Sequence, residues 1–298
     1  MIRGVLRAVG TAVGLATGAY LAMVGVRGSR ALVRPIVRPF LPDGPDAPTT
    51  PADIGLEYET VRFTTEDGVT LSGWLIPAAH ETRTAVIVMH GFSRHRLPEL
   101  AAFVPWLQER HHVLQFDFRG HGESEGGLVT LGTHERRDVA AAVRFAESRG
   151  LGPTALFGIS MGAAIAIVSA PDLPVAAVVA DASFADLRHP VASRLRQGGY
   201  PLPGIGARVV IGGAMLRARS RLTDPIRAVA RIAPRALLLI APREDRLISW
   251  RQSLRLFEAA GEPKELVVVE GAGHAEAYAM DPQAYREHVL GFLERYLG

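Results

Sequence analysis

The feature that most limits the possible folds is a series of short apolar segments that alternate with helical patterns. The segments show no regular polar alternation, which is typical of strands buried on both faces of a sheet. They occupy residues 85–89, 113–118, 154–157, 175–180, 236–240 and 266–269. Helical patterns lie between or after them, at residues 98–110, 133–148, 161–169, 250–260 and 282–297. This order predicts an α/β fold with a mostly parallel, doubly wound sheet and helices on both of its faces.

Two further regions set the expected domain organisation. Residues 57–65 and 69–76 have strand patterns, and the acidic turn between them ends in glycine, which predicts a hairpin. Residues 183–232 are helical in pattern, punctuated by Gly and Pro, and rich in Arg. We expect them to form a helical cap, inserted into an α/β core of residues 55–182 and 233–298. Such a cap would cover the carboxyl ends of the parallel strands, where open α/β sheets bind ligands.

The N-terminal region carries a long uncharged segment. Residues 8–26 contain no charged side chain, whereas arginines precede and follow them. As a helix, this segment would span about 28 Å, close to the roughly 30 Å hydrocarbon core of a bilayer. We therefore predict a single-pass transmembrane anchor within residues 1–30 and a membrane location. A cleaved signal sequence, and hence secretion, is the alternative, and the arginines on both sides leave the orientation open.

Proline and glycine shape the surroundings of the predicted anchor. Proline recurs through residues 31–54, which predicts a semi-rigid linker to the folded domain. Gly10, Gly14 and Gly18 would share one face of a helix, a spacing that permits close packing of helices in a membrane. A composition rich in Ala and Gly produces the same spacing by chance, and this is the interpretation that we prefer.

A serine between two glycines stands where a predicted strand meets a predicted helix. Gly158, Ser160 and Gly162 form a G-x-S-x-G pattern at this position. A chain that turns so sharply places the serine at the apex in a strained conformation, and the flanking positions need glycine because a side chain would meet neighbouring backbone. An ordinary serine in a Gly-rich turn is the alternative. The strand–turn–helix context favours a nucleophile.

Two more side chains are placed to activate this serine. A serine hydroxyl is a weak nucleophile unless a base accepts its proton and an acid orients that base. Asp245 and His274 each follow a strand pattern, so both fall at carboxyl ends of strands, on the same edge of the sheet as Ser160. We predict Ser160 as nucleophile, His274 as general base and Asp245 as orienting acid. Asp181, also at the end of a strand pattern, is an alternative acid.

Acyl transfer further requires hydrogen-bond donors for the oxyanion of the tetrahedral intermediate. Gly91 follows the strand pattern at residues 85–89 and lets the chain turn close to the nucleophile. The backbone N–H groups of Phe92 and Met161 are the predicted donors, and Met161 opens a helix. We interpret His90 as a residue that shapes this loop.

From about residue 57 to the C-terminus, the chain resembles the α/β-hydrolase superfamily, in particular the branch of monoacylglycerol lipases, serine aminopeptidases and membrane-anchored relatives. The resemblance is carried by His90-Gly91-Phe92, the turn at residues 117–124, the Ser160 pattern, Asp245 and Gly273-His274. It implies hydrolysis of carboxylic esters or related acyl compounds through a Ser-His-Asp triad and an acyl-enzyme. Serine peptidase, amidase or thioesterase chemistry would use the same side chains.

Composition narrows the remaining classes. The chain has no cysteine, which excludes disulfides, thiolate nucleophiles and Cys-ligated zinc, and no H-E-x-x-H pattern. We expect no cofactor and no metal. Arginine is concentrated in residues 1–38 and 183–231 without interleaved aromatics, which favours a membrane or acidic ligands over nucleic acid. The expected partners are a small-molecule acyl substrate and the membrane. The alternative to an enzyme is a catalytically inactive, membrane-anchored binding protein.

Overall fold

The computed structural model describes residues 2–42, 44 and 47–298, and these residues contain one sheet of eight strands. The strand order is β1-β2-β4-β3-β5-β6-β7-β8. The first two pairings are antiparallel, and every pairing from β4 to β8 is parallel, which confirms the predicted fold class. The strands are β1 (Glu59–Thr64), β2 (Thr70–Ile76), β3 (Ala85–Met89), β4 (His112–Phe116), β5 (Thr154–Ile159), β6 (Ala177–Asp181), β7 (Ala236–Pro242) and β8 (Lys264–Val269).

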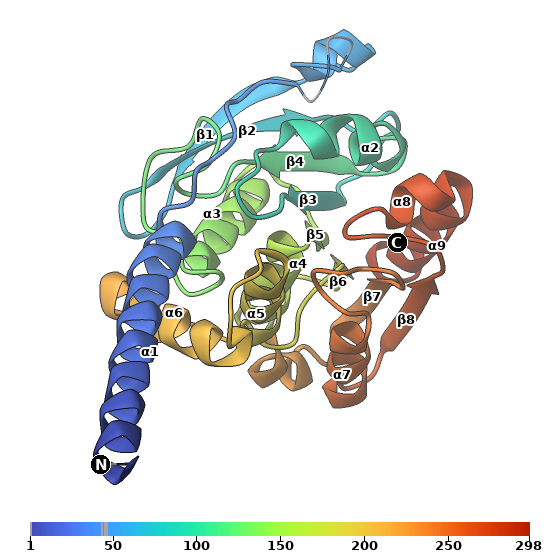
Figure 1. Cartoon of the computed structure of the whole chain (residues 1–298). Helices are drawn as coiled ribbons and strands as arrows, with labels where there is room; N and C mark the ends of the chain where they lie inside the picture. Colours follow the sequence, from blue (N-terminus) through green and yellow to red (C-terminus); the bar gives the residue numbers. More distant parts are fainter. Residues whose placement is uncertain (1, 43, 45–46) are drawn as a thin grey trace.

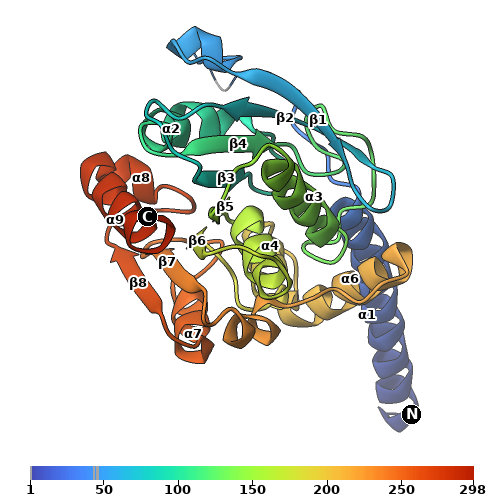
Figure 2. The same ribbon diagram turned by 180° about the vertical axis from the view of Figure 1, so that it is seen from behind.

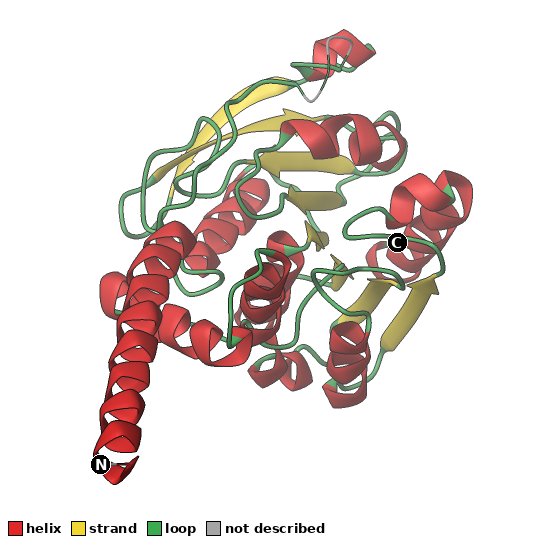
Figure 3. Cartoon of the chain, in the orientation of Figure 1, coloured by secondary structure: helices red, strands yellow, loops and turns green. Residues whose placement is uncertain are grey.

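Helices cover both faces of the sheet (Figures 1 and 3). The helices α2 and α9 pack on one face, whereas α3, α4 and α7 pack on the other. Their bounds, with those of the short helices nearby, are η1 (Pro51–Ile54), α2 (Leu97–Leu107), α3 (Glu135–Ser148), α4 (Met161–Ser169), η2 (Ala170–Asp172), α7 (Arg251–Ala259), α8 (Ala277–Met280) and α9 (Pro282–Leu297).

The central strands are buried on both faces. Every residue of β3, β5, β6 and β7 is buried. In β7, Leu237 and Leu239 enter the core beneath α4, whereas Leu238 and Ile240 enter the core beneath α9. Because neither face meets water, no position along these strands is reserved for a polar residue, which explains their continuous apolar pattern.

Between β6 and β7 the chain leaves the sheet and forms a separate helical segment. It contains α5 (Arg188–Gln197), α6 (Pro203–Ala218), η3 (Pro225–Arg227) and η4 (Val229–Arg231). We call this segment the cap. Its residue Val191 lines the same cavity as Ser160, which follows β5, so the cap covers the carboxyl end of the central strands.

The longest helix is α1 (Ile2–Val33), whose N-terminal end projects away from the domain (Figure 1). Its segment Val9–Val33 contains an 18-residue stretch with a mean hydropathy of 1.6, and 11% of that stretch is buried within the protein. Both a membrane span and a signal sequence have this length and composition. The helix continues through residues 31–33, where the sequence predicted the start of a proline-rich linker.

The C-terminal half of α1 packs across α6 of the cap (Figures 1 and 2). A Cβ atom added to Gly25 would lie 2.6 Å from Cγ1 of Val209, and one added to Gly28 would lie 2.5 Å from Cγ2 of Val210. These two glycines therefore permit the close approach of the helices. By contrast, a Cβ atom added to any of the three glycines of the expected spacing would have no neighbour within 4 Å; they are Gly10, Gly14 and Gly18.

Polar contacts hold the same helix crossing. The Tyr20 hydroxyl donates to the backbone oxygen of Pro201 at 2.7 Å. The Arg217 Nε donates to the buried Ser29 Oγ at 2.9 Å. The contacts join α1 to the cap at both ends of the crossing, so α1 and the cap form one packed unit.

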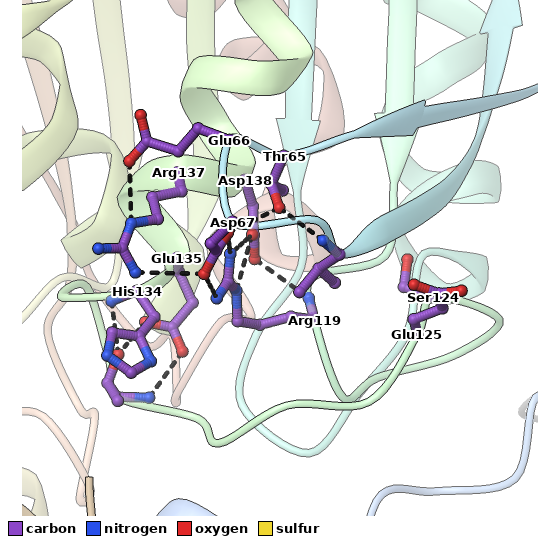
Figure 4. Close-up of polar contacts among 12 residues, drawn as sticks. Thr65, Glu66, Asp67, Arg119, Ser124, Glu125, His134, Glu135, Arg137 and Asp138 are labelled. Atoms are coloured by element: carbon purple, nitrogen blue, oxygen red, sulfur yellow. Dashed lines mark hydrogen bonds and ion pairs between the residues drawn. The ribbon is translucent and has the colours of Figure 1, made fainter. Parts of the chain in front are cut away.

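Ion pairs of the buried Arg119 side chain hold the turn at residues 117–124 (Figure 4). The Arg119 Nε donates to Asp138 Oδ1 of α3 at 2.8 Å, and its Nη1 donates to Asp67 Oδ2 between β1 and β2, also at 2.8 Å. The Arg119 side chain is 3% exposed and the Asp138 side chain is fully buried. This arrangement ties the first hairpin and α3 to the turn, and we assign Arg119 a structural role.

Candidate active site

The strand–helix turn between β5 and α4 places Ser160 in a strained conformation. Its φ and ψ are 54° and −107°. A Cβ atom added to Gly158 would overlap the backbone of Gly162, and one added to Gly162 would overlap the backbone oxygen of Met89. The turn thus requires glycine on both sides of the serine, for steric reasons. The geometry is that of a nucleophile elbow, which presents the serine hydroxyl at the edge of the sheet.

Three side chains far apart in the sequence form a chain of hydrogen bonds. The Ser160 Oγ lies 2.9 Å from His274 Nε2, and His274 Nδ1 lies 2.6 Å from Asp245 Oδ2. Asp245 follows β7 and His274 follows β8. A carboxylate at Nδ1 fixes the tautomer in which that nitrogen carries the proton, which leaves Nε2 free to accept from the serine hydroxyl. The structure therefore brings together all three residues that the sequence singled out for the triad.

Backbone donors hold the Asp245 carboxylate in place. Its Oδ1 accepts hydrogen bonds from the N–H groups of Leu247 at 2.7 Å and Ile248 at 2.8 Å. Its other oxygen faces His274, and its side chain is fully buried. Both oxygens are thus committed, so the carboxylate orients the imidazole from a fixed position.

The predicted alternative acid, Asp181, lies nearby but has another partner. It ends β6, and the Tyr285 hydroxyl of α9 donates to its Oδ2 at 2.9 Å. Burial raises the pKa of Asp181 to about 7, against the opposing effects of the Tyr285 hydrogen bond and of His274. The imidazole of His274 pairs with Asp245 instead. Sequence reasoning did not identify Tyr285, because the only signal is spatial.

The residues predicted to bind the oxyanion lie next to the nucleophile. Phe92, Ser160 and Met161 line one cavity. Met161 is the first residue of α4, so its N–H has no acceptor within that helix. This position makes it available to an oxygen bound at Ser160.

Buried His90 shapes the loop that carries Phe92. Its Nδ1 donates to the Gly91 oxygen at 2.8 Å, while its Nε2 accepts from the Phe118 N–H at 3.0 Å. Burial lowers the pKa of His90 well below its ordinary value, aided by the neighbouring His121. The side chain is therefore neutral and links the loop after β3 to the turn after β4.

Two hollows meet at the serine hydroxyl. A cleft of about 1050 Å³ is lined by Ser160 and His274 and by several charged side chains; these are Arg38, Arg94, Glu99, Arg194 and Glu276. A smaller cavity of about 230 Å³ is also lined by Ser160, and most of its other lining side chains are apolar. Residues of α1 contribute to both hollows. Sequence reasoning missed this contribution because it assigned α1 to an anchor and a linker.

The described residues offer no evident metal site. Across residues 2–42, 44 and 47–298, no three His, Cys, Asp or Glu side chains are grouped so as to hold a metal ion. Each charged or polar group of the hydrogen-bonded chain already has a protein partner. The chemistry available from these residues is nucleophilic attack assisted by proton transfer.

Comparisons with known proteins show which family the chain resembles. The sequence profile described as the Alpha/beta hydrolase family matches residues 86–288. The chain is 29% identical to the uncharacterized protein YfhR of Escherichia coli over 247 residues, which cover 79% of this chain and 80% of YfhR. It is 29% identical to the polyketide transferase grgF of Penicillium sp over 297 residues, which cover 81% of this chain and 98% of that protein.

The structure is also similar to a solved esterase. The esterase Pf2001 of Pyrococcus furiosus superposes with a TM-score of 0.72 and 28% sequence identity, over 88% of this chain and 99% of the esterase. The profile match covers most of the chain, and the structural similarity extends over the sheet and its helices. The chain therefore belongs to the Alpha/beta hydrolase family and is an enzyme of the hydrolase class.

Proposed function

We propose that the protein hydrolyses carboxylic esters, with Ser160 as nucleophile, His274 as general base and Asp245 as orienting acid. The observation that carries this proposal is the continuous chain of hydrogen bonds from the strained serine, through both imidazole nitrogens, to a buried carboxylate. The similarity of the protein to a solved esterase supports esters as substrates over other acyl compounds.

The geometry supports a two-step reaction. The Ser160 Oγ forms a bond to the acyl carbon while its proton passes to His274 Nε2. The N–H groups of Phe92 and Met161 stabilise the oxyanion. The C–O bond to the leaving alcohol then breaks, and that alcohol takes the proton from His274. Water attacks the acyl-enzyme in the second step, gives a proton to His274, and releases the acid while Ser160 regains its proton.

We further propose that α1 is a single-pass membrane anchor retained in the mature protein. Its apolar segment is long enough to cross a bilayer. The packing of Gly25 and Gly28 against α6 supports retention, because loss of α1 would expose the matching surface of the cap. We propose no cofactor, and we propose that neither nucleic acid nor any partner besides the acyl substrate and the membrane is needed.

Labelling with a fluorophosphonate probe tests the nucleophile. We expect the wild type to label and to hydrolyse p-nitrophenyl butyrate. Ser160→Ala should abolish labelling and lower kcat/KM by at least about 10³-fold, because no other group replaces the attacking oxygen. Ser148→Ala, which removes an exposed serine hydroxyl on α3, is the matched control and should behave as wild type. Equal labelling of the wild type and Ser160→Ala would contradict the proposal.

A further inference from the structure

The small cavity beside Ser160 has the character of a site for a hydrocarbon chain. Among the described residues that line it, only Ser160 and Arg194 have polar side chains. Its volume of about 230 Å³ is below the roughly 300–1,000 Å³ of pockets that enclose a whole drug-sized ligand. It therefore suits one part of a substrate. The larger cleft, which Ser160 also lines and which carries the charged side chains, suits the other part.

One wall of this cavity belongs to α1. Gly28, Ala31 and Leu32 line it from α1, together with Leu195 and Val210 of the cap. These positions are three and four apart, so they occupy one face of the helix. The helix that we propose as an anchor thus also contributes to the cavity beside Ser160.

The wall is held in a fixed position. Gly28 packs against Val210, which itself lines the cavity. The next residue, Ser29, is buried and accepts a hydrogen bond from Arg217 of α6. Val33, at the end of α1, is also buried, and its backbone oxygen accepts from the N–H of Val129. The last two turns of α1 are therefore part of the folded domain.

Exposed apolar side chains lie on α1 and on the part of the cap beside it. Leu6, Val13 and Leu15 of α1 are 65%, 59% and 71% exposed. The hydrogen bond from Tyr20 to Pro201 places the tip of the cap beside α1, and there Leu202 is 48% exposed. Exposed apolar surfaces of this kind mark contact with lipid or with other proteins. A lipid phase that holds α1 would thus lie next to the cap and its cavity.

We propose that α1 is a wall of the acyl-binding cavity, that the substrates are esters of fatty acids supplied from a lipid phase, and that Ala31 and Leu32 set the acyl length which is accepted. This inference rests on the proposed ester hydrolysis. The fatty acyl chain occupies the apolar cavity, and the leaving alcohol occupies the larger cleft. Burial of each additional methylene group in the cavity favours the transition state, until the chain reaches the α1 wall.

A series of p-nitrophenyl esters from acetate to dodecanoate tests this, with kcat/KM measured for each full-length variant. Ala31→Phe places a ring at the cavity wall. We expect it to lower the decanoate-to-acetate ratio of kcat/KM by at least about tenfold, as for two methylene groups denied burial. Ala22→Phe is the same change on an exposed part of α1 away from the cavity, and its ratio should equal that of the wild type.

Leu32→Ala provides an independent measurement in the opposite direction. It enlarges the cavity, so we expect the acyl length with the highest kcat/KM to become longer. This variant also tests the proposal if Ala31→Phe fails to fold. Unchanged ratios in folded Ala31→Phe and in Leu32→Ala, or an equal change in Ala22→Phe, would overturn the inference while ester hydrolysis stands. A wild type that hydrolyses none of the esters would instead overturn the proposed function, and the inference with it.

Discussion

At the scale of single residues, two buried aspartates near one imidazole have different environments. Asp245 accepts two backbone hydrogen bonds and faces His274, whereas Asp181 accepts from Tyr285. The sequence alone identifies both as candidates, because each ends or follows a strand at the same edge of the sheet. Only the coordinates show which one the imidazole contacts.

Replacement of each aspartate by asparagine should separate their roles. In Asp245→Asn, the side-chain NH₂ would face His274 Nδ1 and favour the tautomer that carries its proton on Nε2, which no longer accepts from Ser160. We expect kcat to fall by roughly 10³- to 10⁴-fold. Asp181→Asn keeps an acceptor for Tyr285 and should retain kcat within about tenfold. Steady-state kinetics on one ester measures both, and a larger loss in Asp181→Asn would mean that the acid is misassigned.

The raised pKa of Asp181 predicts a dependence of stability on pH. Its pKa rises from the ordinary 3.8 to about 7 in the folded protein, chiefly by burial. Between these values the folded state holds a proton that the unfolded chain has released, so this residue's contribution to stability falls as pH rises through that window. Asp181→Asn removes the contribution. We expect its free energy of unfolding, relative to the wild type, to be higher at pH 8 than at pH 4.5.

Urea denaturation at the two pH values measures this difference. Glu270→Gln, an exposed carboxyl group with 75% of its side chain accessible, is the control and should show no such change. An identical pH response of Asp181→Asn and the wild type would mean that Asp181 is ionised in the folded protein at neutral pH.

At the scale of elements, the β5–α4 turn depends on two glycines. Gly162→Ala would bring its Cβ into the backbone of β3, so neighbouring strands must shift. We expect a loss of about 1–3 kcal/mol in the free energy of unfolding, with reduced activity. Gly212→Ala on helix α6 is the matched control, since a Cβ atom added there would have no neighbour within 4 Å. We expect it to raise the free energy of unfolding by about 0.5–1 kcal/mol. Thermal and urea unfolding compare the two, and equal stabilities would contradict the steric argument.

The sequence predicts the sheet and the β5–α4 turn well, because burial and steric limits restrict which residue types can occupy these short segments. The expected strand at residues 236–240 lies within β7, and the expected helix at residues 161–169 coincides with α4. Each pattern is set by the few residues around it. The roles of the site residues stay predictions, although the structure brings their side chains together.

Helix packing between distant segments is less predictable, as the glycines of α1 show. Gly10, Gly14 and Gly18 have a regular spacing that permits close packing of helices. The glycines in contact with α6, however, are Gly25 and Gly28. Their role depends on Val209 and Val210, far away in the sequence. Nothing local distinguishes a glycine that meets a partner helix from one that faces the surroundings.

At the scale of the whole molecule, α1 joins two environments. Its N-terminal part is exposed and apolar, while Val24 and Val33 are buried against the folded domain. A helix that is continuous from one environment to the other leaves little freedom between the proposed anchor and the catalytic domain. We therefore expect the active site to keep a fixed position near the lipid phase, unlike a domain on a long flexible tether.

Two truncations of α1 should separate anchoring from catalysis. Removal of residues 2–23 deletes most of the apolar span but keeps the turns that pack on α6, so the protein should move from the membrane pellet to the supernatant and still hydrolyse p-nitrophenyl acetate.

Removal of residues 2–33 also deletes the cavity wall formed by Ala31 and Leu32 and exposes the surface around Val210. We expect this second form to unfold at a lower temperature and to lose its preference among acyl lengths. Fractionation after carbonate washing, thermal unfolding and ester kinetics measure the three properties. If the shorter deletion stays in the pellet, α1 is not the anchor; if the longer one matches it in stability and acyl preference, the last turns of α1 are not part of the domain.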